Sequence, residues 1–179
     1  GQSLSNADIL ALCSLLFIAG SETTMNGISG GLLAFISNPE QMVRLESDPS
    51  LWPKAVEEIL RYVSPVLNGM VRTATEDIDV RDVTIKAGDK VTLWYGAANR
   101  DEEIFADPDR FDVSRTPNDH LAFGFGEHFC LGASLARLEI RVTFEELLAR
   151  HPDPALAGAP ARLRSNIFNG LEHLPVRLA

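Results

Sequence analysis

The feature that most constrains the fold is a long helical pattern near the start of the chain. Residues 5–8, Ser-Asn-Ala-Asp, offer N-cap side chains, and the pattern continues to about Ser37, where Asn38-Pro39 stops it. Roughly 30 residues of α-helix span about 45 Å. The first half, from Ile9 to Ile18, is apolar at almost every position, and a helix that is apolar all round is expected to be buried all round.

The rest of the chain is short for the task of covering that helix. Its 179 residues amount to one domain at most, so we expect residues 1–179 to form a single unit. Because little sequence is left over to wrap the helix, we expect partner sequence to be missing. The chain would then be a fragment, a truncated gene product or one half of a split assembly.

Composition narrows the class of protein. Apolar residues make up 45% of the chain, which is typical of a globular protein. A net charge of −9 argues against binding to nucleic acid or to an anionic membrane surface. The most apolar run, Ile9 to Ala19, is well short of the ~20 residues of a membrane span. The two cysteines form no disulfide framework, and Cys13, in the apolar run, is expected to be a buried thiol. We therefore expect a cytoplasmic protein.

The remaining pattern predicts a mainly α-helical fold with a small β region. Further helices are expected over residues 39–47, 51–63 and 131–150. Period-two stretches predict strands within residues 71–97, with Ala87-Gly88-Asp89 as a hairpin turn. Residues 99–121 are expected to form a loop, and residues 167–178 to form short strands.

A glycine-rich segment places one cysteine just before the last helical pattern. Cys130 therefore lies at a helix N-terminus, where the helix dipole and the unpaired N–H groups favour a thiolate. Gly124, Gly126 and Gly132 lack Cβ atoms, so a flat ligand can approach the backbone and the loop can adopt positive φ. A thiolate presented in this way suits haem iron, because it pushes electron density onto the metal.

Residues 123–132 read Phe, Gly, any, Gly, any, His, any, Cys, any, Gly, and this pattern resembles the haem-binding loop of the cytochrome P450 family. Residues 19–24 resemble the oxygen-activating segment of the long central helix of that family. Residues 58–61 resemble its Glu-x-x-Arg motif, and residues 108–111 resemble a segment that supplies a further arginine. The resemblance implies the C-terminal portion of a bacterial soluble P450 fold, since family members are more than twice as long as this chain.

The resemblance also implies a role for each matching residue. Cys130 would be the axial thiolate of haem b, in a loop that includes Gly124 and Gly132. Arg72 and His128 would pair with the haem propionates, and His120 is a plausible third partner. Phe123 would pack beside the sulfur. Two alternatives remain open for the cysteine: an ordinary buried thiol, or a zinc site made with His120 and His128, although structural zinc usually has four ligands.

Three residues, Ser21 to Thr23, interrupt the apolar helix, directly after Ala19 and Gly20. By resemblance, Ala19 and Gly20 line a groove where oxygen binds, Thr23 holds a water or the oxygen ligand, and Glu22 feeds protons inward. The alternative is a kinked helix in which the Thr23 hydroxyl bonds to a carbonyl one turn earlier.

Structural and substrate-binding roles follow from the remaining matches. Glu58 and Arg61 share a helix face, and the resemblance implies a buried network completed by Arg110. The alternative is a surface ion pair worth ~0.3 kcal/mol. Met70 and Phe168 would face the substrate, or would simply pack in the core.

The implied activity is insertion of one oxygen atom from O₂ into a small hydrophobic organic substrate. Electrons would come from NAD(P)H through a ferredoxin-type redox partner. The alternative is a non-catalytic haem-binding remnant that lacks the N-terminal half needed for turnover. A zinc-stabilised structural domain is a weaker third interpretation.

Overall fold

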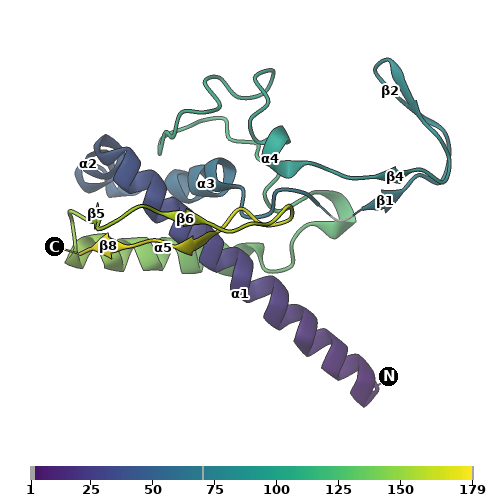
Figure 1. Ribbon diagram of the computed structural model, residues 1–179, viewed down its shortest axis with the longest axis horizontal. Coiled ribbons are helices and arrows are strands. Elements are labelled where there is room, and N and C mark those ends of the chain that lie inside the picture. Colours follow the sequence, from purple (N-terminus) through teal and green to yellow (C-terminus); the bar gives the residue numbers. More distant parts are fainter. Residues whose placement is uncertain (1–2, 70, 179) are drawn as a thin grey trace.

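The structure, a computed structural model, describes residues 3–69 and 71–178. A long helix, α1 (Asn6–Ser37), crosses the molecule, and other helices pack around its C-terminal half (Figure 1). These are α2 (Pro39–Ser47), α3 (Trp52–Val63) and α5 (Ala133–Arg150), with shorter turns at η1 (Pro49–Leu51), α4 (Tyr95–Ala98) and η2 (Gly126–His128). The mainly α-helical fold with a small β region is confirmed.

Both ends of α1 are set by the residues expected to set them. The Ser5 hydroxyl accepts a hydrogen bond from the Asp8 amide at 3.2 Å, and the Asp8 carboxylate accepts one from the Ser5 amide at 3.1 Å. This reciprocal pair is a capping box, which satisfies amide groups that the helix itself leaves unpaired. The helix ends at Ser37, directly before Asn38 and Pro39.

Small residues let α3 and α5 approach the second half of α1 closely. A Cβ atom added to Gly30 would lie 2.6 Å from a Val63 methyl carbon, and one added to Gly31 would lie 2.9 Å from Ile59 and 3.0 Å from Phe144. Such contacts are too short for real carbon atoms, so the glycines are what permit this packing.

An aromatic cluster fills the space where these helices meet. The ring of Phe35 on α1 lies 5.2 Å from Phe144, 5.4 Å from Phe111 and 6.4 Å from Trp52, in edge-to-face geometry each time. Edge-to-face pairs add stability beyond the area that they bury. Phe111 belongs to the loop between α4 and η2, so this cluster also fastens that loop to the helices.

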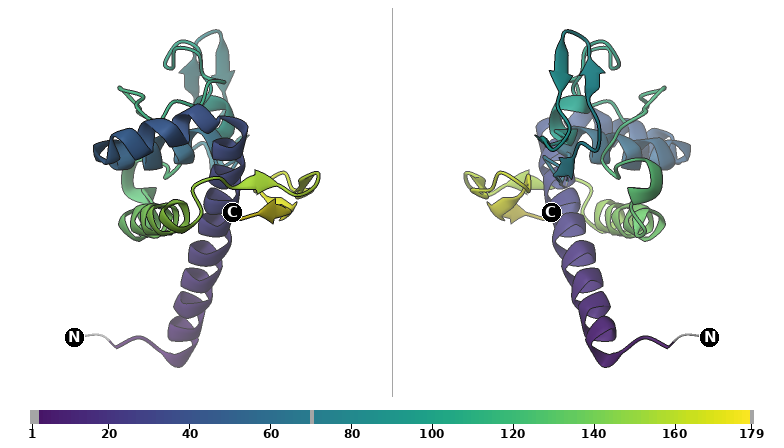
Figure 2. Two further views of the ribbon diagram at one scale, coloured as in Figure 1. Left: turned by 90° about the vertical axis from the view of Figure 1, so that its left-hand side faces the viewer. Right: turned by 90° about the vertical axis from the view of Figure 1, so that its right-hand side faces the viewer.

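The first half of α1 extends away from the rest of the molecule (Figures 1 and 2). Its apolar side chains are exposed, with Leu10 at 68% and Phe17 at 75% of their full accessibility. The expected burial of this stretch is therefore wrong for this chain, because no described segment folds back over it. The Cys13 thiol is also exposed, not buried as expected.

By length and composition alone, α1 also satisfies the criteria for a membrane-spanning helix, and it is the one described helix that does so. A core helix of a soluble protein satisfies the same criteria.

The β region consists of antiparallel pairs of short strands. β1 (Arg72–Thr73) pairs with β4 (Lys90–Val91), and β2 (Ile78–Val80) pairs with β3 (Val83–Ile85). The tight turn between β2 and β3 is therefore at Arg81 and Asp82, with Arg81 at a φ of 54°. The expected hairpin turn at residues 87–89 is a turn, with Gly88 at a φ of 92°, but it connects β3 and β4, which do not pair with each other.

Near the C-terminus, β5 (Ala155–Leu156) pairs with β8 (Val176–Arg177), and β6 (Ala161–Arg162) pairs with β7 (Leu171–His173). The strands after residue 167 were expected. Their partners β5 and β6 are too short to show a period and were not predicted, and neither was the single turn of α4.

Candidate functional site

The cysteine loop adopts the backbone that its glycines permit. Gly124 and Gly126 have φ values of 71° and 66°, in the left-handed region that favours glycine. Gly132 has a φ of −85°, so it does not need this freedom. A Cβ atom on Gly132 would lie 3.9 Å from the Cys130 sulfur, which places this glycine beside the thiol.

Cys130 is held from both sides by backbone hydrogen bonds. Its amide donates to the Phe123 carbonyl at 2.9 Å, and its carbonyl accepts from the Ala133 amide at 3.2 Å. Ala133 is the first residue of α5, so the cysteine lies three residues before that helix, close to its N-terminus.

The surroundings of this thiol fit a flat apolar ligand such as haem. The Cys130 thiol is exposed, and so are the neighbouring rings of Phe125 and Phe129. A cysteine thiolate is one of the protein ligands that hold haem iron, and the apolar side chains and glycine backbone beside it leave room for a flat ring.

The zinc alternative has no support in the described part of the chain. Within residues 3–69 and 71–178, no group of three or more His, Cys, Asp and Glu side chains is placed to hold a metal ion. His120 in particular lies against the carboxylate of Glu57, with 3.0 Å between Nε2 and Oε2.

The three candidate propionate partners are in different surroundings. Arg72 is half-buried on β1, and His128 is exposed on η2 beside the cysteine. The side chain of His120 is only 3% exposed and is already paired with Glu57, which argues against a propionate role for it. The Tyr95 hydroxyl lies near the backbone of both Gly69 and Gly124, so the chain leading into β1 passes close to the cysteine loop.

The candidate oxygen groove lies midway along α1. Ala19 and Gly20 are exposed, and a Cβ atom on Gly20 would meet no atom within 4 Å. The Thr23 hydroxyl donates to the Ala19 carbonyl at 2.7 Å, which is the bond expected for the kinked-helix alternative, yet α1 continues unbroken through this turn. A hydroxyl that donates one hydrogen bond can still accept another, so this bond is compatible with either role.

The buried carboxylate network exists, but its second arginine differs from the predicted one. Arg61 donates to both oxygens of Glu58 at 2.8 and 2.9 Å, and both side chains are fully buried. Arg115, not Arg110, completes the network, with its Nε 3.1 and 3.2 Å from the two oxygens. Arg110 contributes only its backbone carbonyl, which accepts from Arg61 and Arg115, and its own side chain is exposed.

The course of the loop explains why Arg115, and not Arg110, reaches Glu58. The Arg61 guanidinium also donates to the carbonyls of Asn99 and Pro108, and Arg115 also donates to those of Ala106 and Asp107. The loop thus wraps its carbonyls around two buried cations. An irregular loop has no period, so the sequence does not indicate which of its arginines points inward.

Met70 and Phe168 were expected to face the substrate, and the segment that precedes Met70 lies beside the segment that carries Phe168. Val66 and Phe168 form an isolated antiparallel bridge, and the Leu67 amide donates to the Ile167 carbonyl at 2.7 Å. Phe168 is half-buried. Met70 lies outside the described residues.

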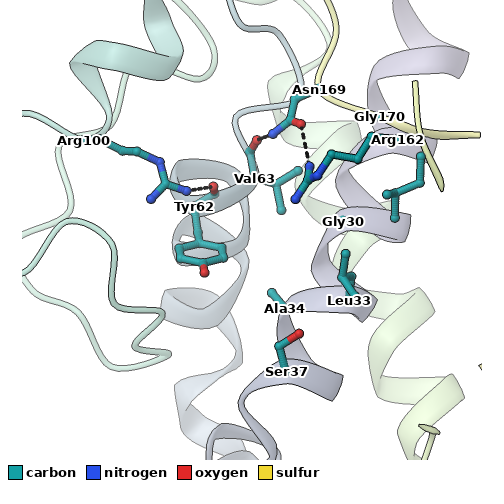
Figure 3. Close-up of a pocket in the computed structure, with 11 residues that line it drawn as sticks. Gly30, Leu33, Ala34, Ser37, Tyr62, Val63, Arg100, Arg162, Asn169 and Gly170 are labelled. Atoms are coloured by element: carbon teal, nitrogen blue, oxygen red, sulfur yellow. Dashed lines mark hydrogen bonds between the residues drawn. The ribbon is translucent and has the colours of Figure 1, made fainter. Parts of the chain in front are cut away.

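A cavity of about 200 Å³ lies elsewhere, between the second half of α1, the end of α3 and β7 (Figure 3). Arg100 and Arg162 reach its rim, where Arg100 donates to the Tyr62 carbonyl and Arg162 donates to Asn169. None of the predicted haem or oxygen residues lines this cavity, so it is separate from the cysteine site.

A second carboxylate beside the site, that of Glu57, was not predicted from the sequence. Glu57 accepts two hydrogen bonds from Arg137 on α5, at 2.7 and 2.9 Å, as well as lying against His120. Burial alone would raise the pKa of Glu57, but the hydrogen bonds from His120 and Arg137 and their positive charge outweigh it and lower the pKa to about 2. The one available signal was the Glu57-Glu58 doublet, which puts a carboxylate on each of two faces of α3.

Comparison with known proteins agrees with this geometry. The family model for cytochrome P450 matches residues 50–151. Cytochrome P450 107B1 of Saccharopolyspora erythraea is 49% identical over 99% of this chain and 44% of its own length. The methyl-branched lipid omega-hydroxylase of Mycobacterium tuberculosis is 53% identical over 98% of this chain and 41% of its own length.

A solved structure shows the same fold. P450BioI, in complex with a hexadec-9Z-enoic acid-ligated acyl carrier protein, superposes with a TM-score of 0.95 at 47% identity, over all of this chain and 47% of that one. The chain thus spans less than half the length of the relatives that it matches. Since the family model covers more than half of this chain and includes its cysteine loop, the chain belongs to the cytochrome P450 family.

Proposed function

We propose that the protein is a haem-dependent monooxygenase that inserts one oxygen atom from O₂ into a small hydrophobic organic substrate. The observation that carries this proposal is the Cys130 thiol, which is exposed at the end of a glycine loop and whose backbone carbonyl is bonded to the first residue of α5. The family has this loop to bind haem, and the residues present fit that group.

In this proposal each residue near the cysteine has a defined task. The Cys130 thiolate ligates the haem iron, and Arg72 and His128 neutralise the propionates. Gly124 and Gly132 keep the backbone beside the sulfur free of side chains, and Phe123 packs beside it. Haem b supplies the activation of O₂, which no side chain of the protein can provide.

Residues of α1 would manage protons. Glu22 and Thr23 are both half-buried on one turn of the helix. The Thr23 hydroxyl donates to Ala19, and its oxygen remains able to accept a hydrogen bond from a water molecule. Glu22 can exchange protons with solvent and pass them to that water.

The overall reaction balances with two electrons and two protons. One oxygen atom enters a C–H bond of the substrate and the other leaves as water. The electrons come from NAD(P)H through a reductase and a ferredoxin-type partner, in a cytoplasmic setting. The names of two similar proteins, a lipid hydroxylase and a P450 bound to an acyl-loaded carrier protein, support an extended aliphatic substrate.

One observation favours a second candidate function for this chain on its own. The turn of α1 that carries Ala19 and Gly20 is exposed, and so is the apolar half of the helix before it. A haem bound at Cys130 would then be open to water on the α1 side, so the isolated chain would bind haem without efficient turnover.

Turnover with isotopically labelled O₂ tests the proposed function. The full-length protein, a surrogate ferredoxin and reductase, NAD(P)H and a fatty acid are incubated together, and products are examined by mass spectrometry. The proposal predicts a product that carries one labelled oxygen atom. Unlabelled product, or NAD(P)H consumption without product across a panel of aliphatic substrates, would favour the non-catalytic alternative.

A further inference from the structure

A cluster of charged and aromatic side chains joins three elements behind the cysteine loop. Glu57 on α3 accepts from Nε and Nη2 of Arg137 on α5, at 2.7 and 2.9 Å. The same carboxylate lies 3.0 Å from Nε2 of His120, in the segment before the loop. A two-pronged guanidinium–carboxylate contact of this kind fixes orientation as well as distance.

The cluster continues through an aromatic ring to the cysteine itself. The Arg137 guanidinium carbon lies 4.6 Å from the centre of the Phe123 ring, within the range of a cation–π contact. The same ring packs against His120 at 6.0 Å and Phe129 at 6.1 Å between ring centres. The Phe123 carbonyl then accepts the hydrogen bond of the Cys130 amide. Arg137 thus contacts the ring of the same residue whose carbonyl anchors the cysteine.

The electrostatics point the same way. The hydrogen bond to Glu57 raises the pKa of Arg137, burial opposes this, and attraction to Glu57 and to Cys130 adds to the rise. The Arg137 guanidinium, which stays charged at any ordinary pH, therefore lies against Phe123, the residue whose carbonyl accepts from the cysteine amide.

We propose that Glu57, His120 and Arg137 are positioning residues for Cys130: Glu57 fixes Arg137 and His120, these two hold the ring of Phe123, and the backbone carbonyl of Phe123 accepts the hydrogen bond of the cysteine amide. This inference rests on the proposed role of Cys130 as the haem ligand. Groups that orient and tune a metal ligand without touching the metal are as necessary to a site as the ligand itself. The Arg137 charge has a second consequence, because a nearby cation withdraws electron density from the thiolate and favours reduction of the iron.

These two contributions of Arg137 can be separated by substitution. Arg137→Gln removes both the charge and the two-pronged contact, whereas Arg137→Lys keeps the charge and loses the geometry. Glu57→Gln leaves Arg137 in place without its anionic partner. Arg141→Gln is the matched control, because Arg141 lies one turn further along α5 in an exposed pair with Glu145.

The experiment uses the haem-loaded full-length protein and measures two quantities: the rate of haem transfer to apomyoglobin and the reduction potential of the iron. We expect Arg137→Gln, Arg137→Lys and Glu57→Gln to lose haem about 10-fold faster than the unsubstituted protein. The potential should become more negative in Arg137→Gln and stay unchanged in Arg137→Lys, and Arg141→Gln should change neither quantity.

The inference would be overturned if haem transfer is unchanged in Arg137→Gln, Arg137→Lys and Glu57→Gln, or if Arg141→Gln loses haem as fast as they do. If Arg137→Gln does not load haem, the rate of haem transfer from Arg137→Lys supports the inference when it is raised and overturns it when it is unchanged. The proposed function is judged separately, on the unsubstituted protein: a carbon monoxide spectrum without thiolate character there would refute haem–thiolate ligation itself, whatever the variants do.

Discussion

At the scale of single residues, Thr23 shows how a side chain can satisfy the helix and still serve chemistry. Its hydroxyl proton is engaged by the Ala19 carbonyl, which leaves the oxygen as an acceptor. The helix needs no kink at this point, since α1 is continuous from Asn6 to Ser37.

We therefore predict that Thr23→Ala in the turnover-competent protein lowers the product formed per NAD(P)H several-fold and releases the difference as peroxide, because proton delivery is lost while oxygen binding survives. Thr23→Ser, which keeps the hydroxyl, is the control and should retain coupling. Equal coupling in all three proteins would favour a purely structural hydroxyl.

The stability that the Glu57 carboxylate contributes to the fold should depend on pH. The pKa of this carboxylate is about 2 in the folded protein, below the ordinary value of 4.5. A lowered pKa means that the carboxylate contributes stability in full above about pH 5 and loses it as the pH falls from there towards 2. The titratable groups that face the Glu57 carboxylate are His120, in the segment before the cysteine loop, and Arg137 on α5.

Glu57→Gln should accordingly reduce the free energy of unfolding at pH 7, and the difference from the unsubstituted protein should shrink between pH 5 and pH 2. Denaturant titrations at several pH values measure this. A difference that stays constant across that range would show that the Glu57 charge is not what stabilises the fold.

At the scale of elements, the buried ion network ties the loop to α3. Glu58 lies between Arg61 and Arg115 and is fully buried, so Glu58→Gln leaves the buried Arg61 without a counter-charge, whereas Arg115→Ala leaves Glu58 still paired with Arg61. We predict that Glu58→Gln costs about 3–5 kcal/mol of unfolding free energy, and that Arg115→Ala costs about 1.5–3 kcal/mol through its lost hydrogen bonds to the carboxylate.

Arg110→Ala is the matched control for this prediction. Because the Arg110 side chain is exposed and only its carbonyl is used, the substitution should change stability by less than about 0.5 kcal/mol. Thermal and denaturant unfolding of the two alanine variants would separate them. A large loss in Arg110→Ala together with a small one in Arg115→Ala would restore the prediction made from the sequence.

Packing between helices gives a further element-scale prediction. Gly31→Ala would place a methyl group within 3.0 Å of Ile59 and Phe144, so it should destabilise the protein by about 1–3 kcal/mol. Gly20→Ala meets no neighbour within 4 Å and improves helix propensity, so it should leave stability unchanged or raise it. Stability curves in urea that rank the two variants in the opposite order would contradict the described packing.

The sequence predicted the elements that carry a period or a cap. The ends of α1 follow from Ser5, Asp8 and Pro39, and the two-residue offset at the start of α5 is within the usual uncertainty of helix ends. It could not predict which arginine of the loop enters the Glu58 network or that Glu57 pairs with Arg137. Both contacts join residues tens of positions apart. The first depends on the path of an irregular loop, and the second depends on how α3 and α5 pack together.

At the scale of the whole molecule, the dominant feature is the bare first half of α1. Its large apolar side chains are exposed together along the helix, a larger patch than most soluble monomers show. The chain spans 41–47% of the length of the relatives named above, and none of its described segments covers this surface.

We predict that the isolated chain binds a hydrophobic dye and self-associates. Sedimentation velocity and dye fluorescence measure the two effects, and Phe17→Glu together with Leu10→Glu should weaken both without loss of helix content. A monodisperse monomer that binds no dye would contradict the exposed helix described here.

Every role proposed for the cysteine loop depends on ligation of haem by Cys130, and the absorption spectrum of the reduced protein with carbon monoxide tests this ligation. The chain offers its own control, because Cys13 is a second exposed thiol on α1, away from the loop. We predict the red-shifted Soret band of thiolate ligation in the unsubstituted protein and in Cys13→Ala, and its loss in Cys130→Ala. An unshifted, histidine-type band in freshly prepared protein, or a shifted band that survives Cys130→Ala, would contradict the account.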